Sequence, residues 1–183
     1  MRHYTLFILL VFPFLFQSSN PAPARVQTWL KGHVERWDVE IGDKKGEFEI
    51  GFKNDPNSWR YTSDGKEVLI ETYFKDHFNH WQFTVGGQRF YLETQMPGSW
   101  TRWQLSGDTL KTMRIETFYG QSWDNWNFDA QAGRCQISTR IHNRFEDWEI
   151  SGPHDKLSEG ERMAALFLPV LIGRVQQQGL FKD

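Results

Sequence analysis

The residues that could perform chemistry are few and scattered along this 183-residue chain. His77 and His80 form an H-x-x-H pair in DHFNH, but the pair falls in a predicted hairpin connection and no third metal ligand is evident. The single cysteine, Cys135, has no obvious base partner, which disfavours a nucleophilic role. No phosphate-binding loop, nucleophile elbow or paired-cysteine motif occurs. We therefore expect a protein without catalytic activity, bound metal or cofactor.

Five residues remain as candidates for ligand binding. The basic residues Arg60, His80 and Arg102 each flank a tryptophan of a regular series. If neighbouring hairpins bring them together, they could bind the phosphate of a lipid headgroup. Trp100 and Trp123 stand beside that series, and exposed indole rings can stack on sugars. The alternatives are a solvated surface for the basic residues and packing at the rim of the fold for the two tryptophans.

The tryptophan series reveals a structural repeat. Its members are 22 residues apart, with one step of 23: Trp37, Trp59, Trp81, Trp103, Trp126 and Trp148. Apolar and polar residues alternate on both sides of a glycine-containing turn in each unit, which predicts a β-hairpin. The alternation places a row of carboxylates on the solvent-exposed face of the sheet, at Glu49, Glu71, Glu93 and Glu116. It places a further column on the buried face, at Phe52, Phe74, Met96, Tyr119 and Ile141.

The repeat predicts about twelve strands. Five full units supply ten, and partial units at Val26 and Trp148 supply one each. A sheet of this length curls because its strands twist, and closure removes both edges. The fold class is therefore mainly β, a closed antiparallel barrel of about 12 strands built from 22-residue hairpin repeats. The extra residue of the Trp103 unit predicts a longer turn or bulge around residues 109–112.

One apolar stretch has the properties of a central helix. Residues 162–173, RMAALFLPVLIG, are apolar on every side, so a helix formed by them must be enclosed. Ser158 and Glu161 form a capping box that marks its start. We expect a hydrophobic C-terminal helix at about 158–173, inside the barrel. Pro169 should kink or end it.

The first 24 residues have the pattern of a secretory signal peptide. A basic start at Arg2 and His3 precedes an apolar segment at 6–16 and an A-x-A site that ends at Ala24. The alternative is an uncleaved membrane anchor. Residues 25–183 then form a single domain, which we expect to be a monomer exported to the periplasm or the extracellular space. The formal net charge of −2 argues against a nucleic-acid partner.

Three segments resemble the Tubby C-terminal-like superfamily, which includes the LURP-one-related proteins and the phospholipid scramblases. They are IETFYGQSWDNWNF (115–128), RCQISTRIHNRFEDWEI (134–150) and LSEGERMAALFLPVLIG (157–173). The resemblance implies a twelve-stranded barrel around a C-terminal helix. It also implies lipid binding, because some Tubby-like proteins bind phosphoinositides through basic side chains. A weaker resemblance, carried by WNFDAQAGR (126–134), is to the YD (RHS) repeat.

These observations predict a non-catalytic, exported binding or scaffold protein that associates with phospholipid or a membrane surface. Two alternatives stay open. A carbohydrate-binding module of the cell envelope would expose Trp100 and Trp123 on one rim. An envelope enzyme would need a cleft with a perturbed carboxylate pair or a His–Cys contact.

Overall fold

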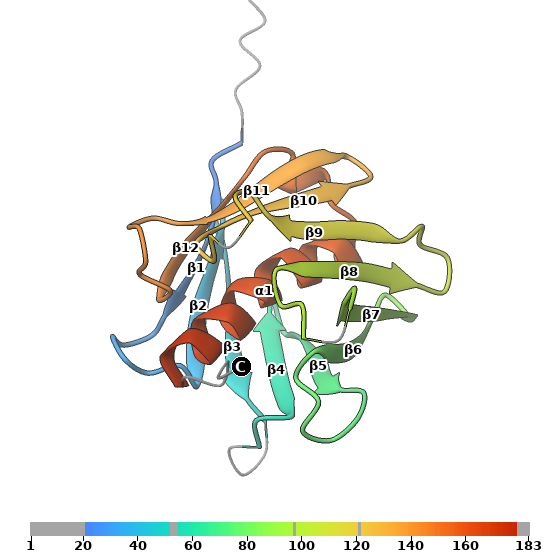
Figure 1. Cartoon of the computed structure of the whole chain (residues 1–183), viewed down its shortest axis with the longest axis horizontal. Coiled ribbons are helices and arrows are strands. Elements are labelled where there is room, and N and C mark those ends of the chain that lie inside the picture. Colours follow the sequence, from blue (N-terminus) through green and yellow to red (C-terminus); the bar gives the residue numbers. More distant parts are fainter. Residues whose placement is uncertain (1–20, 52–54, 97, 121, 179–183) are drawn as a thin grey trace, which may run out of the picture.

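The computed structural model describes residues 21–51, 55–96, 98–120 and 122–178. In this part of the chain, twelve strands surround one long helix (Figure 1). Every strand is antiparallel to its sequence neighbours, and β1 pairs with β12, so the barrel is closed. The predicted fold class is confirmed. The strands are β1 (Ala24–Thr28), β2 (Arg36–Ile41), β3 (Lys44–Ile50), β4 (Ser58–Ser63), β5 (Lys66–Thr72), β6 (His80–Val85), β7 (Gln88–Thr94), β8 (Arg102–Gly107), β9 (Met113–Thr117), β10 (Asn125–Ala130), β11 (Gly133–Thr139) and β12 (Asp147–Ser151).

The antiparallel order gives the barrel two unlike ends. The hairpin turns lie at one end, here called the turn end. The connection between β8 and β9 lies there too and is longer than the others, as predicted near residues 109–112. Longer connections lie at the other end, here called the loop end: 29–35, 51–57, 73–79, 95–101, 118–124 and 140–146. A short 3₁₀ helix (His154–Lys156) follows β12, and α1 (Glu159–Gln178) then runs from the turn end to the loop end.

The repeating tryptophans form the inner wall. All of them are at most 1% exposed: Trp37, Trp59, Trp81, Trp103, Trp126 and Trp148. In five units the indole nitrogen donates a hydrogen bond to the backbone carbonyl three residues earlier, over 2.6–3.0 Å: Trp37 to Val34, Trp81 to Phe78, Trp103 to Trp100, Trp126 to Trp123 and Trp148 to Phe145. These bonds satisfy a polar group that burial would otherwise leave unpaired.

The helix α1 packs against this wall on all sides. The ring of Phe167 lies 5.1 Å from that of Trp81 and 6.2 Å from that of Trp59. At Gly173, an added Cβ would lie only 2.3 Å from a ring carbon of Trp37, so glycine lets the helix approach the wall. The capping box is confirmed, because the Glu161 carboxylate accepts from the Ser158 amide over 2.8 Å.

Two sequence expectations about the core are wrong. The helix α1 does not end at Pro169 or near residue 173, because it continues to Gln178. The other outcome predicted at Pro169, a kink, stays a prediction. The column of Phe74, Met96, Tyr119 and Ile141 does not face the core, because these residues are 52–69% exposed. The strands end before this column, and the chain turns outward there. Phe52, the remaining member, lies outside the described residues.

The predicted domain boundary at residue 24 falls at the start of the first strand. Ala24 opens β1, pairs with Ile150 and is 2% exposed. Two residues upstream, the Ala22 carbonyl accepts a hydrogen bond from His154 Nε2 over 2.8 Å. Most of the predicted signal peptide, residues 1–20, lies outside the described residues, and its cleavage stays a prediction.

The enclosed helix makes a direct prediction about stability. Leu168 is 1% exposed inside the barrel, so Leu168→Asp would bury an unpaired carboxylate. The cost of several kcal/mol is comparable with the whole stability of a domain, about 5–15 kcal/mol. We expect the variant to lose its cooperative thermal transition in circular dichroism. The matched control is Leu69→Asp at a position that is 48% exposed, which should melt near wild type. A Leu168→Asp protein that also melts near wild type would refute the enclosed helix.

Candidate functional site

The largest group of exposed apolar side chains lies at the loop end. The residue seven positions before a wall tryptophan is 47–69% exposed in every described repeat, which contrasts with the buried tryptophans themselves. We call these residues the crown: Leu30, Phe74, Met96, Tyr119 and Ile141. Beside them, Trp29, Tyr73 and Phe118 are 46–52% exposed. Five separate loops thus present large apolar side chains at the same end of one barrel.

A repeated backbone turn produces the crown. The carbonyl of each crown residue accepts a hydrogen bond from the amide three residues later, over 2.6–3.1 Å: Leu30 from His33, Phe74 from His77, Met96 from Ser99, Tyr119 from Ser122 and Ile141 from Arg144. In four of these turns the third residue has a positive φ: Gly32, Asp76, Gly98 and Asn143. Glycine, asparagine and aspartate tolerate that conformation best. This Gly/Asp/Asn spacing is the signal in the sequence that could have identified the turns.

Hydrogen bonds between neighbouring loops hold the crown in place. Asn57, which is 8% exposed, donates to Asp55 and Asp76 and accepts from the Asp76 amide, so it joins two loops. The Asp124 carboxylate likewise contacts His142 of the next loop. Glu146 accepts from the Gly32 amide over 2.9 Å, which ties the last loop to the first. These bonds join the loop 51–57 to the loop 73–79, and they join the loops 118–124, 140–146 and 29–35 to one another, with carboxylates as acceptors or contacts.

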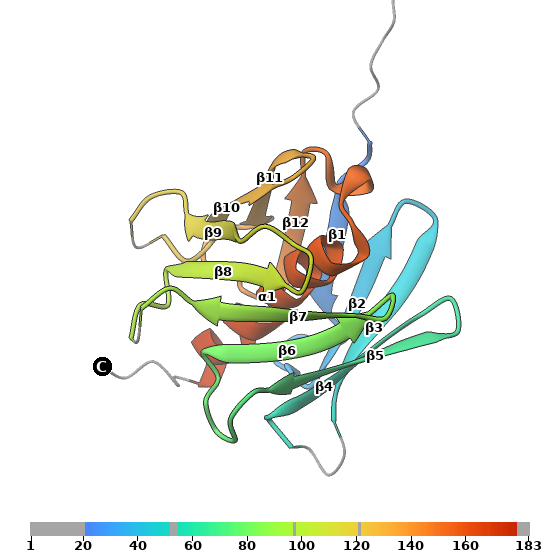
Figure 2. The same ribbon diagram turned by 90° about the vertical axis from the view of Figure 1, so that its right-hand side faces the viewer.

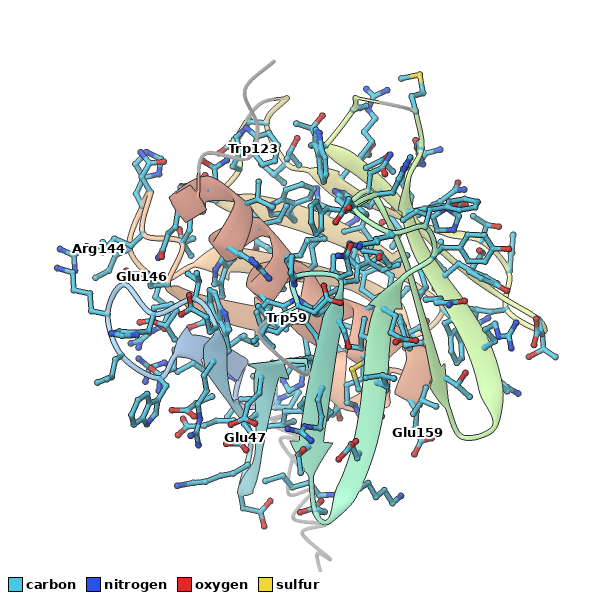
Figure 3. The ribbon with its side chains drawn as sticks, turned by 90° about the horizontal axis from the view of Figure 1, so that it is seen from below. Glu47, Trp59, Trp123, Arg144, Glu146 and Glu159 are labelled. Atoms are coloured by element: carbon cyan, nitrogen blue, oxygen red, sulfur yellow. The ribbon has the colours of Figure 1, made fainter. Side chains whose placement is uncertain are left out.

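Basic side chains lie among the apolar ones. Lys31 and Lys75 directly follow the crown residues Leu30 and Phe74, and Arg144 closes the turn that begins at Ile141. All three cations are exposed, and none forms an ion pair with another described residue. Figure 3 shows Arg144 projecting from one edge of the molecule, opposite the edge where Glu159 opens α1. The loop end thus combines apolar tips with three cations outside ion pairs, beside the carboxylates of the same loops: Glu35, Asp55, Asp76, Asp124 and Glu146.

The basic residues proposed from the sequence are not brought together. Arg60, His80 and Arg102 lie on β4, β6 and β8, and an intervening strand separates each from the next. Arg60 also follows its tryptophan, whereas His80 and Arg102 precede theirs. Each faces a carboxylate instead: Arg60 with Glu49 at 3.4 Å, His80 with Glu93 at 3.3 Å and Arg102 with Glu116 at 4.0 Å. The repeating glutamates on the outer wall are their partners, and a shared phosphate site gains no support from this arrangement.

His80 instead belongs to an aromatic cluster on the outer wall. Its ring stacks on Tyr73 at 4.8 Å and lies 6.2 Å from the ring of Tyr91. The ring of His77 lies 5.8 Å from that of Phe74, and its backbone carbonyl accepts a hydrogen bond from the His80 amide over 3.2 Å. No group of three or more potential metal-binding side chains occurs among the described residues.

Trp100 and Trp123 lie at the loop end but are only partly exposed. The Trp100 ring packs on Trp103 at 5.7 Å, and that of Trp123 packs on Trp126 at 6.1 Å. Their carbonyls accept the indole hydrogen bonds of the wall, so both residues support the barrel rim. The glycan hypothesis needs both rings exposed on one rim, and full burial of both would have excluded it. The partial exposure of Trp100 and Trp123 meets neither condition.

Comparisons of the chain with protein-family models, curated proteins and solved structures give no significant match. Membership of the Tubby C-terminal-like superfamily or of the YD (RHS) repeat family therefore stays a prediction. Among the described residues, α1 does not have the length and apolar character that crossing a bilayer requires.

The environment of Cys135 opposes a nucleophilic role and gives a testable reactivity. The residue is fully buried, and burial, with smaller contributions from Glu161 and Asp155, raises the pKa of its thiol to about 11. A raised pKa keeps the thiol neutral, and only the thiolate is nucleophilic.

We therefore expect iodoacetamide to alkylate Cys135 in the folded protein at pH 8 roughly a hundredfold more slowly than in denaturant. Gln136→Cys supplies the control, because residue 136 is exposed and faces outward beside it. Mass spectrometry should show one rapid addition, at the introduced thiol. Equal rates at both thiols would contradict the buried, neutral state of Cys135.

Proposed function

We propose that this protein is a non-catalytic binding domain that docks on an anionic membrane surface through the loop end of its barrel. The observation that carries the proposal is the crown, a set of apolar side chains at one repeat position, exposed on one end of the molecule. Burial of each large apolar side chain contributes about 1.5–3 kcal/mol, and each nearby lysine or arginine contributes about 1 kcal/mol at an anionic leaflet. Shallow insertion of several tips is therefore enough for reversible binding.

The chemistry of the crown resembles that of interfacial membrane anchors. Tyrosine and tryptophan favour the boundary between headgroups and acyl chains, and Trp29, Tyr73 and Tyr119 are exposed at the loop end. Lys31 and Lys75 directly follow apolar tips, so their ammonium groups can meet phosphates while those tips enter the bilayer. The bonds within and between loops mean that little ordering entropy opposes docking.

The glycan alternative is less well supported. Exposed aromatic rings suit sugars, but the crown also contains the aliphatic residues Leu30, Met96 and Ile141, which offer no ring for stacking. Trp100 and Trp123, the residues first considered for sugars, brace the rim. The envelope-enzyme alternative requires a reactive side chain, and the buried, neutral thiol of Cys135 does not supply one.

Vesicle co-sedimentation tests the proposal. The exported protein should sediment with vesicles of phosphatidylcholine and phosphatidylglycerol, and less with phosphatidylcholine alone. The double variant Phe74→Ser/Tyr119→Ser removes two tips and should lower the partition coefficient by roughly tenfold to a hundredfold. The variant Lys31→Gln/Lys75→Gln should reduce the preference for anionic vesicles while leaving apolar binding in place.

The matched control is Leu69→Ser, which removes an apolar residue of similar exposure from the wall of the barrel rather than from the loop end. It shares the N-terminus of the other proteins, so any contribution of that segment cancels. Binding that falls equally in the control and the crown variant would contradict the proposal. So would binding of glycans, but not of vesicles, at the loop end.

A further inference from the structure

A cavity of about 170 Å³ lies at the turn end, far from the crown. It opens beside the first turns of α1 and is lined by the ends of the hairpins β2–β3 and β4–β5, which project on the right of Figure 2, and by Val85 of β6. Its volume is many times the ~15 Å³ that one water molecule needs. It therefore has room for a chemical group of several heavy atoms.

Strand divergence creates the cavity. Within β5 and β6 only Ile70–Thr72 pair with Trp81–Phe83, although β5 extends back to Lys66 and β6 on to Val85. The hairpins β4–β5 and β6–β7 therefore separate toward their turns, and the inward-facing Val68 and Val85 line the space between them. At Gly46 an added Cβ would lie 2.6 Å from the Tyr61 hydroxyl. The absence of a side chain there lets the phenol reach the cavity.

The cavity lining has an apolar part and a charged part. The apolar part consists of Val39, Ile41, Val68, Val85, Met163 and Leu166. The cations at the opening are Lys44, Lys45, Lys66 and Arg162, and the carboxylates are Asp64 and Glu159. The four cations exceed the two anions, so the opening carries a positive balance next to an apolar interior.

Only some of the positively charged side chains that line the cavity form ion pairs within the described part of the protein. Lys44 pairs with Asp64 at 3.6 Å, whereas Lys45 and Lys66 form no ion pair with any other described residue. Arg162 Nη2 donates to the carbonyls of Asp155 and Leu157, at 3.3 and 3.1 Å. Arg162 Nε is buried and has no acceptor among the described residues. Buried donors of this kind are uncommon unless a bound group completes them.

We infer that the turn-end cavity binds a small anionic amphiphile, an alkyl carboxylate or an alkyl phosphate. The alkyl chain contacts the valines, Met163 and Leu166. The anionic head meets Lys45, Lys66 and the Arg162 guanidinium, where charge-assisted hydrogen bonds are strong. The site lies at the opposite end of the barrel from the membrane-docking crown and does not depend on it.

Methyl NMR of methionine-labelled protein tests the site and separates it from the crown. Met163 lines the cavity, whereas Met96 belongs to the crown. Titration with octanoate or octyl phosphate below micelle formation should shift the Met163 methyl signal in a saturable manner and leave that of Met96 in place. The tighter of the two probes identifies the head group. 1-Octanol should bind at least about tenfold more weakly, and inorganic phosphate should not shift Met163.

Two pairs of variants locate the binding. Val68→Phe fills the cavity and should abolish the octanoate shift, whereas Leu69→Phe changes the adjacent residue on the opposite face of β5 and should not. Lys66→Glu should weaken binding about tenfold or more, and Lys111→Glu, a charge change outside the cavity lining, should leave it unchanged.

Several results would overturn the inference. One is the absence of a Met163 shift with either probe, and another is an equal shift of Met96, which would indicate non-specific partition. Equal binding of 1-octanol would show an apolar cavity without anion recognition, and binding of inorganic phosphate alone would show a simple anion site. Vesicle binding would be untouched by any of these results, so this inference and the proposed function can fail separately.

Discussion

The enclosure of α1 by a wall of tryptophans is the constraint on which the rest of the structure depends. A helix that is apolar on every side needs a closed apolar container, and a twelve-stranded barrel needs a filling. The 22-residue repeat satisfies both needs, because each hairpin contributes one buried indole whose nitrogen, in five of the six units, is paired within the same repeat. Phe167 and Gly173 show how closely helix and wall fit.

A filled barrel offers little interior for a ligand, so the two sites that we propose lie at its ends. At the loop end the repeat places an apolar residue at the tip of successive loops, and bonds such as those between Asn57 and Asp76 join neighbouring loops. At the turn end the divergence of β5 and β6 leaves a cavity beside the start of α1. On the outer wall, by contrast, Arg60, His80 and Arg102 are paired with glutamates. The ion pairs of Arg60 and Arg102 are exposed, so they contribute little to stability.

The sequence predicted the architecture well because the repeat expresses it directly. Period-two alternation, the Trp spacing and the capping box of Ser158 and Glu161 each correspond to one feature of the barrel or its helix. It failed where the alternation continues past the end of a strand, since Phe74 and Tyr119 keep the period but lie on turns. Of the two outcomes predicted at Pro169, termination of the helix was also wrong, because tertiary enclosure outweighs the local penalty of proline. Two features depend on three-dimensional spacing that one sequence does not reveal. They are the contacts between neighbouring loops and the cavity at the turn end.

The most direct test of the central claim, that the loop end faces a membrane, is the depth of spin labels in vesicle-bound protein. Gln95→Cys places a nitroxide at the loop end and Asp43→Cys places one at the turn end, and both positions are exposed. The native Cys135 is buried and should stay unlabelled. If the loop end docks on the membrane, vesicle binding increases oxygen accessibility and decreases accessibility to a water-soluble nickel complex at position 95, with no change at position 43. Protection at position 43 alone, or at neither position, would contradict it.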